Sequence, residues 1–180
     1  MFLQRDRSCL LIIDVQERLA PVMSDPRRVL QNCGLLMRAA QRLAIPTLVT
    51  EQYPKGLGPT MVDLRPYLPE AGALPKLSFS AAADQAILAR LRGLGRDQVV
   101  IAGIETHICV LQTALDLQSR GFQPMVVADA CGSRRVESEQ MAWSRLRQCG
   151  VQLLSFEMAV FEWLGEAGTP EFKELSGLVK

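Results

Sequence analysis

An apolar strand followed directly by a helix that carries a cysteine is the feature that most constrains this chain. Residues 98–110 read QVVIAGIETHICV, and the run from Val99 to Ala102 is typical of a strand buried on both faces. Gly103 ends that run, and Thr106 has a side chain preferred at the N-cap of a helix. We therefore expect Thr106 to open a helix, with its hydroxyl accepting a hydrogen bond from the backbone N–H of Cys109.

A cysteine at this position is suited to nucleophilic chemistry. The positive end of a helix lowers the cost of a thiolate, and ligands of open α/β sheets bind at the carboxyl ends of the strands. Cys109 could equally be a small buried apolar residue, as free cysteines often are. A nucleophile at Cys109 therefore requires that the chain also supply an acid–base group and a cation.

Apolar runs alternate with amphipathic stretches along the rest of the chain. We expect strands at 9–15, 45–50, 98–102, 124–128 and 151–154. We expect helices at 26–43, 81–91, 106–119, 136–148, 158–164 and 172–178. Residues 51–80, with several prolines and glycines, are expected to form an irregular connection. Strands alternating with helices predict an α/β fold: a single doubly wound, Rossmann-like domain over residues 1–180, with a central parallel sheet of five to six strands flanked by helices.

The composition is that of a soluble globular protein and narrows the choice of partners. Hydrophobic residues make up 48% and charged residues 22% of the 180 residues, and 20 basic against 19 acidic residues leave a net charge of +1. Nucleic acid or an anionic membrane would favour a basic patch, so we expect neither as a partner. No apolar run approaches the roughly 20 residues that span a bilayer.

The cysteines indicate a reducing compartment. They are five in number, scattered along the chain and without a Cys-x-x-Cys pair. This usage is typical of reduced thiols in a cytosol-like environment, so we predict a cytoplasmic protein. The N-terminal residues MFLQRDRSCLLIIDVQ predict a strand rather than a signal peptide.

Two charged residues are candidate partners for the cysteine. Asp14 follows an apolar run in IIDVQ, where it is either a turn residue or a carboxylate paired or exposed in a cleft. Lys76 lies in LPKLSFS, where it is either an exposed loop charge or a fixed cation that favours a thiolate. Because the ends of parallel strands converge at one edge of the sheet, Asp14 and Cys109 can meet there.

Three motifs together resemble those of the isochorismatase-like cysteine hydrolases, a family that also contains nicotinamidases and N-carbamoylsarcosine amidase. They are IIDVQ near the start, K-x-x-F-S beginning at Lys76, and VVIAGIETHICV. They occur in the family's order over about residues 9–154, and the segment TEQYPKGLG looks similar to the isochorismatase domain-containing branch.

The resemblance implies a catalytic triad. Asp14 would be the general base that takes the thiol proton and later gives it to the leaving group. Lys76 would hold the aspartate and the thiolate electrostatically, and Cys109 would attack an amide-like or imine-like carbon. The family pattern also implies a cis peptide bond between Ile104 and Glu105, and an oxyanion hole formed by the backbone N–H groups of Glu105 and Cys109. Four flanking residues either line the substrate pocket or simply pack beside it: Gln16, Gln52, Tyr53 and Phe79.

Two departures from the family patterns narrow the chemistry. Nicotinamidases carry a metal site built on Asp-x-His after the second strand, where this chain reads Thr-Glu-Gln-Tyr over residues 50–53. The only histidine, His107, is interpreted as an exposed first-turn residue or one that shapes the pocket mouth, so we expect neither a metal nor another cofactor. The presence of Cys109 favours covalent amide-type chemistry over hydrolysis of a vinyl ether.

The sequence therefore predicts a metal-independent cysteine hydrolase that cleaves a C–N bond of a small amide or carbamoyl substrate through a covalent intermediate on Cys109. Two alternatives stay open: a catalytically silent family member that binds or scaffolds, and a hydrolase of an isochorismate-type ether. Apolar segments outside the sheet, such as 158–164, favour a homo-oligomer, a dimer or larger.

Overall fold

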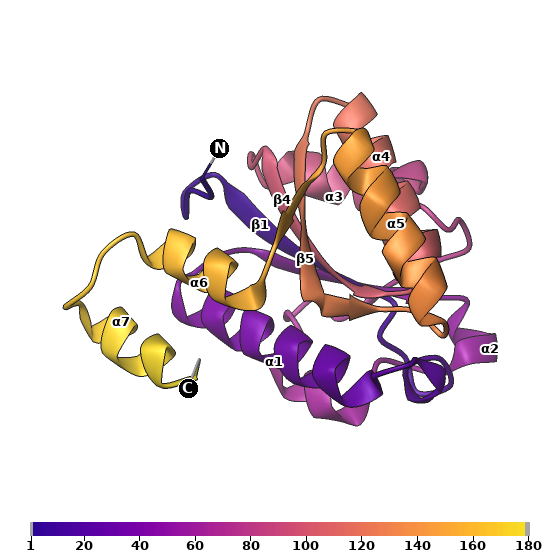
Figure 1. Cartoon of the computed structure of the whole chain (residues 1–180), viewed down its shortest axis with the longest axis horizontal. Helices are drawn as coiled ribbons and strands as arrows, with labels where there is room; N and C mark the ends of the chain where they lie inside the picture. The colour runs from indigo at the N-terminus through magenta and orange to yellow at the C-terminus, as the bar shows by residue number, and fades with distance from the viewer. Residues whose placement is uncertain (1, 179–180) are drawn as a thin grey trace.

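The computed structural model describes residues 2–178 as a parallel β-sheet with helices on both faces (Figure 1). Its six strands are β1 (Ser8–Ile13), β2 (Thr47–Gln52), β3 (Leu74–Lys76), β4 (Gln98–Ile104), β5 (Gln123–Gly132) and β6 (Gln152–Leu154). They lie in the order β3-β2-β1-β4-β5-β6, and each strand runs parallel to its neighbours. The predicted doubly wound α/β fold is confirmed.

The two faces of the sheet bury separate apolar clusters. The helices are α1 (Pro26–Arg42), α2 (Pro54–Leu57), α3 (Gln85–Gly93), α4 (Leu111–Ser119), α5 (Val136–Gln148), α6 (Phe156–Leu164) and α7 (Pro170–Leu175). Shorter 3₁₀ turns are η1 (Ala20–Val22), η2 (Val62–Tyr67), η3 (Ala81–Ala83) and η5 (Ser176–Leu178). Helices α1 and α6 pack on one face, and α3, α4 and α5 pack on the other (Figure 1). Along β1, Leu10 and Ile12 join the first cluster, whereas Leu11 and Ile13 join the second, as the period of a strand buried on both faces requires.

The direction of strand order reverses between β1 and β4. These two neighbours hold the middle of the sheet, with Ile13 opposite Gly103 in the register. In open α/β sheets, the crevice at the carboxyl ends of the strands beside such a reversal is where ligands bind. The fold therefore points to the residues just after β1 and β4 as the functional position.

Gly103 allows β1 and β4 to lie closely side by side at this point. Its φ is +119°, and a Cβ atom built on it would lie 2.1 Å from the carbonyl oxygen of Ile13. A side chain at position 103 would therefore push apart the two strands that carry the candidate site.

The segment predicted as irregular, residues 51–80, contains more structure than expected. It holds α2, η2 and the short strand β3, which pairs with β2 at the edge of the sheet. Three residues with a central Pro75 are too few to show a strand period, and the missing N–H of proline is tolerated at a sheet edge. Within residues 2–178, none of the helices combines the length and apolar character needed to cross a bilayer.

Candidate active site

Asp14 and Lys76 meet in the interior at the carboxyl ends of the strands. Asp14 directly follows β1 and has a φ of 53°, and Lys76 is the last residue of β3. The Lys76 Nζ atom lies 2.7 Å from the Asp14 Oδ2 atom, and neither side chain has solvent-exposed area. Lys76 is thus a buried cation rather than an exposed loop charge.

The Lys76 ammonium is surrounded by oxygen acceptors. Besides Asp14, it donates to Gln52 Oε1 at 2.7 Å and to the carbonyl oxygens of Ser78 and Phe79, each at 3.1 Å. An ammonium has three donors and no acceptor, so its three N–H groups are shared among these four oxygens. The loop after β3 therefore folds around its own lysine.

Asp14 has a basic carboxylate in a tight hydrogen-bond shell. Burial raises its pKa, whereas the charge of Lys76 and hydrogen bonds from Lys76, Thr50 and Cys109 act in the opposite direction. Thr50 Oγ1 donates to Asp14 Oδ1 at 2.7 Å. A carboxylate with a raised pKa accepts a proton more readily, which suits a general base.

Cys109 lies in the π-helical turn η4 (Thr106–Val110), between β4 and α4, and is only 5% exposed. Burial raises the pKa of its thiol to about 12; the charge of Asp14 adds to this effect, and that of Lys76 opposes it. Any lowering of the thiolate's cost by the helix end is therefore smaller than the effect of burial. At neutral pH the Cys109 thiol is neutral.

The predicted N-cap at Thr106 is also wrong. Glu105 occupies the cap position because β4 continues to Ile104, and Thr106 is already inside the turn. Among the atoms the structure describes, the buried Thr106 Oγ1 has no hydrogen-bond partner. The turn is held by its backbone instead, since the N–H groups of Ile108 and Val110 both donate to the Glu105 carbonyl at 3.1 and 3.2 Å.

The peptide bond between Ile104 and Glu105 is cis, as the resemblance implies. The side chain of Glu105 is buried rather than solvated, and it forms an ion pair with Arg134. Neither this pairing nor the Thr50 bond to Asp14 was predicted. Thr50 could have been found by pairing the first two strands in sequence, because it lies opposite Ile13 in the register.

The four predicted pocket residues differ in their surroundings. The Gln16 amide is fully buried and bonded to main chain, donating to the carbonyls of Gln52 and Gly58 and accepting from the Gln52 N–H. Gln52 itself contacts Lys76. Tyr53 and Phe79 are 52% and 54% exposed. Gln16 thus links segments of the chain, whereas Tyr53 and Phe79 present side chains that a ligand could reach.

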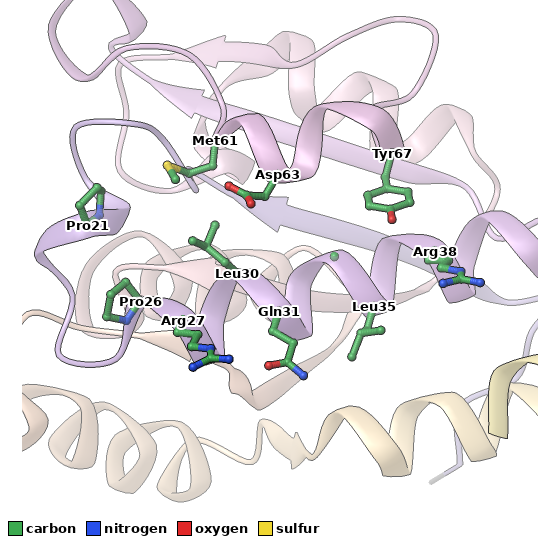
Figure 2. A pocket seen from close by; sticks show the side chains of 11 residues that line it. Pro21, Pro26, Arg27, Leu30, Gln31, Leu35, Arg38, Met61, Asp63 and Tyr67 are labelled. Carbon is green, nitrogen blue, oxygen red and sulfur yellow. The ribbon is translucent and has the colours of Figure 1, made fainter. Parts of the chain in front are cut away.

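One cavity adjoins this cluster, and a second lies away from it. A cleft of about 670 Å³ is lined by Tyr53, Lys76, Ser78 and neighbouring residues of α2 and the start of α3. A groove of about 630 Å³ lies between α1 and η2, with Leu30, Leu35, Met61 and Tyr67 among its walls (Figure 2). The groove takes its lining from α1, η2 and the segment before α1, so of these two cavities only the first is lined by a residue of the cluster, Lys76.

No group of three or more histidine, cysteine, aspartate and glutamate side chains within residues 2–178 is arranged to hold a metal ion. Glu51, which stands where nicotinamidases have metal-binding residues, accepts hydrogen bonds from the N–H and hydroxyl of Thr60, each at 2.7 Å. Asp129, at another strand end, accepts from the N–H of Phe156 at 2.7 Å and so holds the start of α6.

Comparisons with known proteins place the chain in a family. The isochorismatase domain model matches residues 8–158. Isochorismatase domain-containing protein 2 of Bos taurus is 40% identical over 175 residues, covering 96% of this chain and 83% of the relative. Its counterpart in Danio rerio is 39% identical over 175 residues, covering 96% and 86%. The chain belongs to the isochorismatase domain family.

Solved structures show the same fold over nearly the whole chain. The MAR1 ribonuclease of Caenorhabditis elegans matches with a TM-score of 0.92 and 34% identity, covering 99% of this chain and 92% of that one. The YcaC gene product of Escherichia coli, described as an octameric hydrolase of unknown specificity, matches with a TM-score of 0.92 and 25% identity, covering 99% and 90%.

Proposed function

We propose that this chain is a metal-independent cysteine hydrolase that cleaves a C–N bond of a small amide or carbamoyl substrate. The observation that carries the proposal is the buried Asp14–Lys76 ion pair at the reversal of strand order, with the Cys109 thiol near enough that Asp14 and Cys109 shift each other's pKa. Perturbed titratable groups that converge at such a point are typical of catalytic sites. The proposal treats residues 1–180 as one hydrolase domain.

The chemistry begins with proton transfer. Asp14 accepts the Cys109 proton as the Sγ atom forms a bond to the substrate carbonyl carbon, and the C=O electron pair moves onto oxygen. The backbone N–H groups of Glu105 and Cys109 would stabilise that oxyanion. Asp14 then passes the proton to the leaving nitrogen, the C–N bond breaks, and a Cys109 thioester remains.

Hydrolysis of the thioester restores the enzyme. Asp14 takes a proton from water as the water oxygen attacks the thioester carbon, and the released sulfur recovers that proton as the acid product leaves. Lys76 keeps a positive charge beside both reacting groups, which stabilises Asp14 as a carboxylate and sulfur as a thiolate while it forms.

The closed surroundings of the triad favour a small substrate. Cys109 is nearly buried and Asp14 is completely so, while Tyr53 and Phe79 are the predicted pocket residues with exposed side chains. A homo-oligomer and a cytoplasmic location also stay predictions. The octameric YcaC relative supports the first of these.

A screen of small amides and carbamoyl compounds, followed by ammonia release, tests the proposal. With an active substrate, Cys109→Ala should abolish turnover, and intact mass should show an acyl adduct on the wild type under rapid quench. Cys131→Ala is the matched control, because Cys131 is also buried near the strand ends. Unchanged turnover in the Cys109→Ala variant would reject the covalent mechanism.

Two further assays separate the alternatives. Pyruvate release from isochorismate would indicate ether hydrolysis, and RNA cleavage would indicate the activity in the name of the Caenorhabditis elegans relative. Tight binding of small amides without turnover or adduct would favour a silent binding protein.

A further inference from the structure

A second group of charged side chains lies directly beside the proposed nucleophile turn. The Glu105 carboxylate is 4% exposed and accepts hydrogen bonds from Arg134, from its backbone N–H at 3.0 Å and from its Nε atom at 3.1 Å to each oxygen. Hydrogen bonds to an ionised group are among the stronger ones in proteins, and outer-shell partners of this kind orient reacting groups. Glu105 is therefore locked to the loop between β5 and α5.

The same loop holds the turn at a second point. His107 Nδ1 lies 2.9 Å from Ser133 Oγ, and the N–H of the fully buried Ser133 donates to Glu139 Oε2 at 3.1 Å. Glu139, on α5, also pairs with Arg28 of α1 at 3.1 Å. The loop is thus fixed to two helices, and it contacts the turn through two adjacent residues, Ser133 and Arg134.

These contacts hold the turn that contains the proposed nucleophile, Cys109. Residues 105 and 107 are held by side-chain bonds, and Cys109 lies in the same π-helical turn. The loop begins where β5 ends, and Gly132 pairs with Ile104 in the register, so the two segments leave the sheet side by side. A small displacement of the loop would move Glu105, whose N–H is a proposed oxyanion donor.

We propose that Glu105 and Arg134 are positioning residues, whose ion pair holds the Cys109 turn against the β5–α5 loop and so keeps the thiol buried beside Asp14. This role rests on the proposed function, because it concerns the geometry of the same nucleophile. We use the term latch for the contacts of Glu105 with Arg134 and of His107 with Ser133. His107 is thus a second point at which the β5–α5 loop holds the turn.

The test measures the thiol itself and needs no substrate. The rate constant of Cys109 alkylation by iodoacetamide is followed from pH 6 to 10 by site-resolved mass spectrometry, in a Cys149→Ser background that removes the exposed thiol. Arg134→Met and Glu105→Gln should each speed alkylation at pH 8 by about fivefold or more and move the pH profile to lower pH, because a loosened turn exposes the thiol. Arg134→Lys, which keeps the charge, should recover part of the wild-type profile.

The control breaks an ion pair elsewhere. Arg7 and Asp97 pair just before β1 and β4, at the opposite strand ends from the triad. Asp97→Asn should change the melting temperature without changing the Cys109 profile by more than about twofold. The effects of Glu105→Gln and Arg134→Met should not add in the double variant, since both single variants remove the same ion pair.

Two results would overturn the latch. One is a Cys109 profile that is the same in Arg134→Met, Glu105→Gln and the wild type; the other is an equal change in Asp97→Asn, which would indicate general loosening. Neither result bears on whether turnover depends on Cys109, which the Cys109→Ala assay decides separately. If Arg134→Met does not fold, Arg134→Lys and Glu105→Gln still provide the comparison.

Discussion

Lys76 donates to Asp14 across 2.7 Å in a part of the protein where neither side chain reaches solvent. Two opposite charges removed from water in this way attract each other strongly, but each also loses its hydration. The pair is tolerated because both charged groups have further hydrogen-bond partners: Gln52 and two carbonyls accept from the ammonium, and Thr50 donates to the carboxylate. Disturbing one member should therefore have distinct effects on stability and on reactivity.

Lys76→Met should destabilise the fold in a pH-dependent way. Burial already raises the Asp14 pKa in the folded state, and without Lys76 it rises further. The folded protein then keeps a proton that the unfolded chain has released above about pH 4, so stability falls as the pH rises through the folded-state pKa. Urea unfolding should show a loss of about 3 kcal/mol or more at pH 8, and a smaller loss at pH 5. The exposed Lys55→Met is the control, and a loss independent of pH would contradict this account.

Asp14→Asn should move thiol reactivity and catalysis in opposite directions. The Asp14 charge helps to raise the Cys109 pKa to about 12, so its removal lowers that pKa and alkylation at pH 8 becomes faster. Turnover of any active substrate should nevertheless collapse by about 100-fold or more, because the general base is gone. Site-resolved alkylation with iodoacetamide measures the first effect, with Cys149 as the internal reference. Slower alkylation of Cys109 would show that Asp14 does not act on the thiol as inferred.

Thr50→Val should alter the base without altering the shape of the site. The hydroxyl donates to Asp14 at 2.7 Å and lowers its pKa, so its loss raises that pKa. The rise of kcat/KM with pH, which follows ionisation of the base, should therefore move to higher pH, with a stability loss of about 1 kcal/mol. Thr47→Val, at the other end of β2, is the matched control. An unchanged profile would exclude Asp14 as the titrating base.

Gly103→Ala should disrupt the sheet at the site. The added Cβ would lie 2.1 Å from the Ile13 carbonyl oxygen at a φ of +119°, so both contact and backbone conformation oppose it. We expect a loss of about 4 kcal/mol or failure to fold, measured by urea unfolding. Gly121→Ala is the control, because Gly121 has a φ of +87° but no atom within 4 Å of the added Cβ. That variant should lose only about 1 kcal/mol. Equal losses would mean that backbone strain alone accounts for the effect.

Sequence periodicity alone predicted most of the strands and helices of this protein. Buried runs and amphipathic stretches follow from local sequence periodicity, and the predicted helix at 136–148 coincides with α5. The convergence of Asp14 and Cys109 also followed from the rule that parallel strands end at one edge. Lys76 was different: its segment was compatible with an exposed loop, and its candidate role came from family resemblance. Strand β3, which carries it, is too short to leave a periodic signal.

The failures have a common physical origin. Thr106 was assigned as an N-cap from its residue type, but the end of β4 places Glu105 at that position. The helix end was expected to lower the cost of a thiolate at Cys109, yet burial and the charge of Asp14 outweigh that effect and raise the pKa of the thiol. For Gln16 the sequence left pocket lining and packing both open, and in the structure its amide connects main-chain segments. In each case the outcome depends on neighbours that are distant in the chain.

The sequence by itself therefore determined the α/β class, the alternation of five of the six strands with helices, and the placement of Asp14 and Cys109 at the carboxyl edge of the sheet. These follow from local periodicity and from the geometry of parallel strands. Only the tertiary structure decided that Lys76 is buried in an ion pair with Asp14, that Cys109 is a neutral thiol at neutral pH, and that Arg134 forms an ion pair with Glu105. Burial and hydrogen-bond partners set charge states, and both arise from contacts between segments that the chain brings together only when it folds.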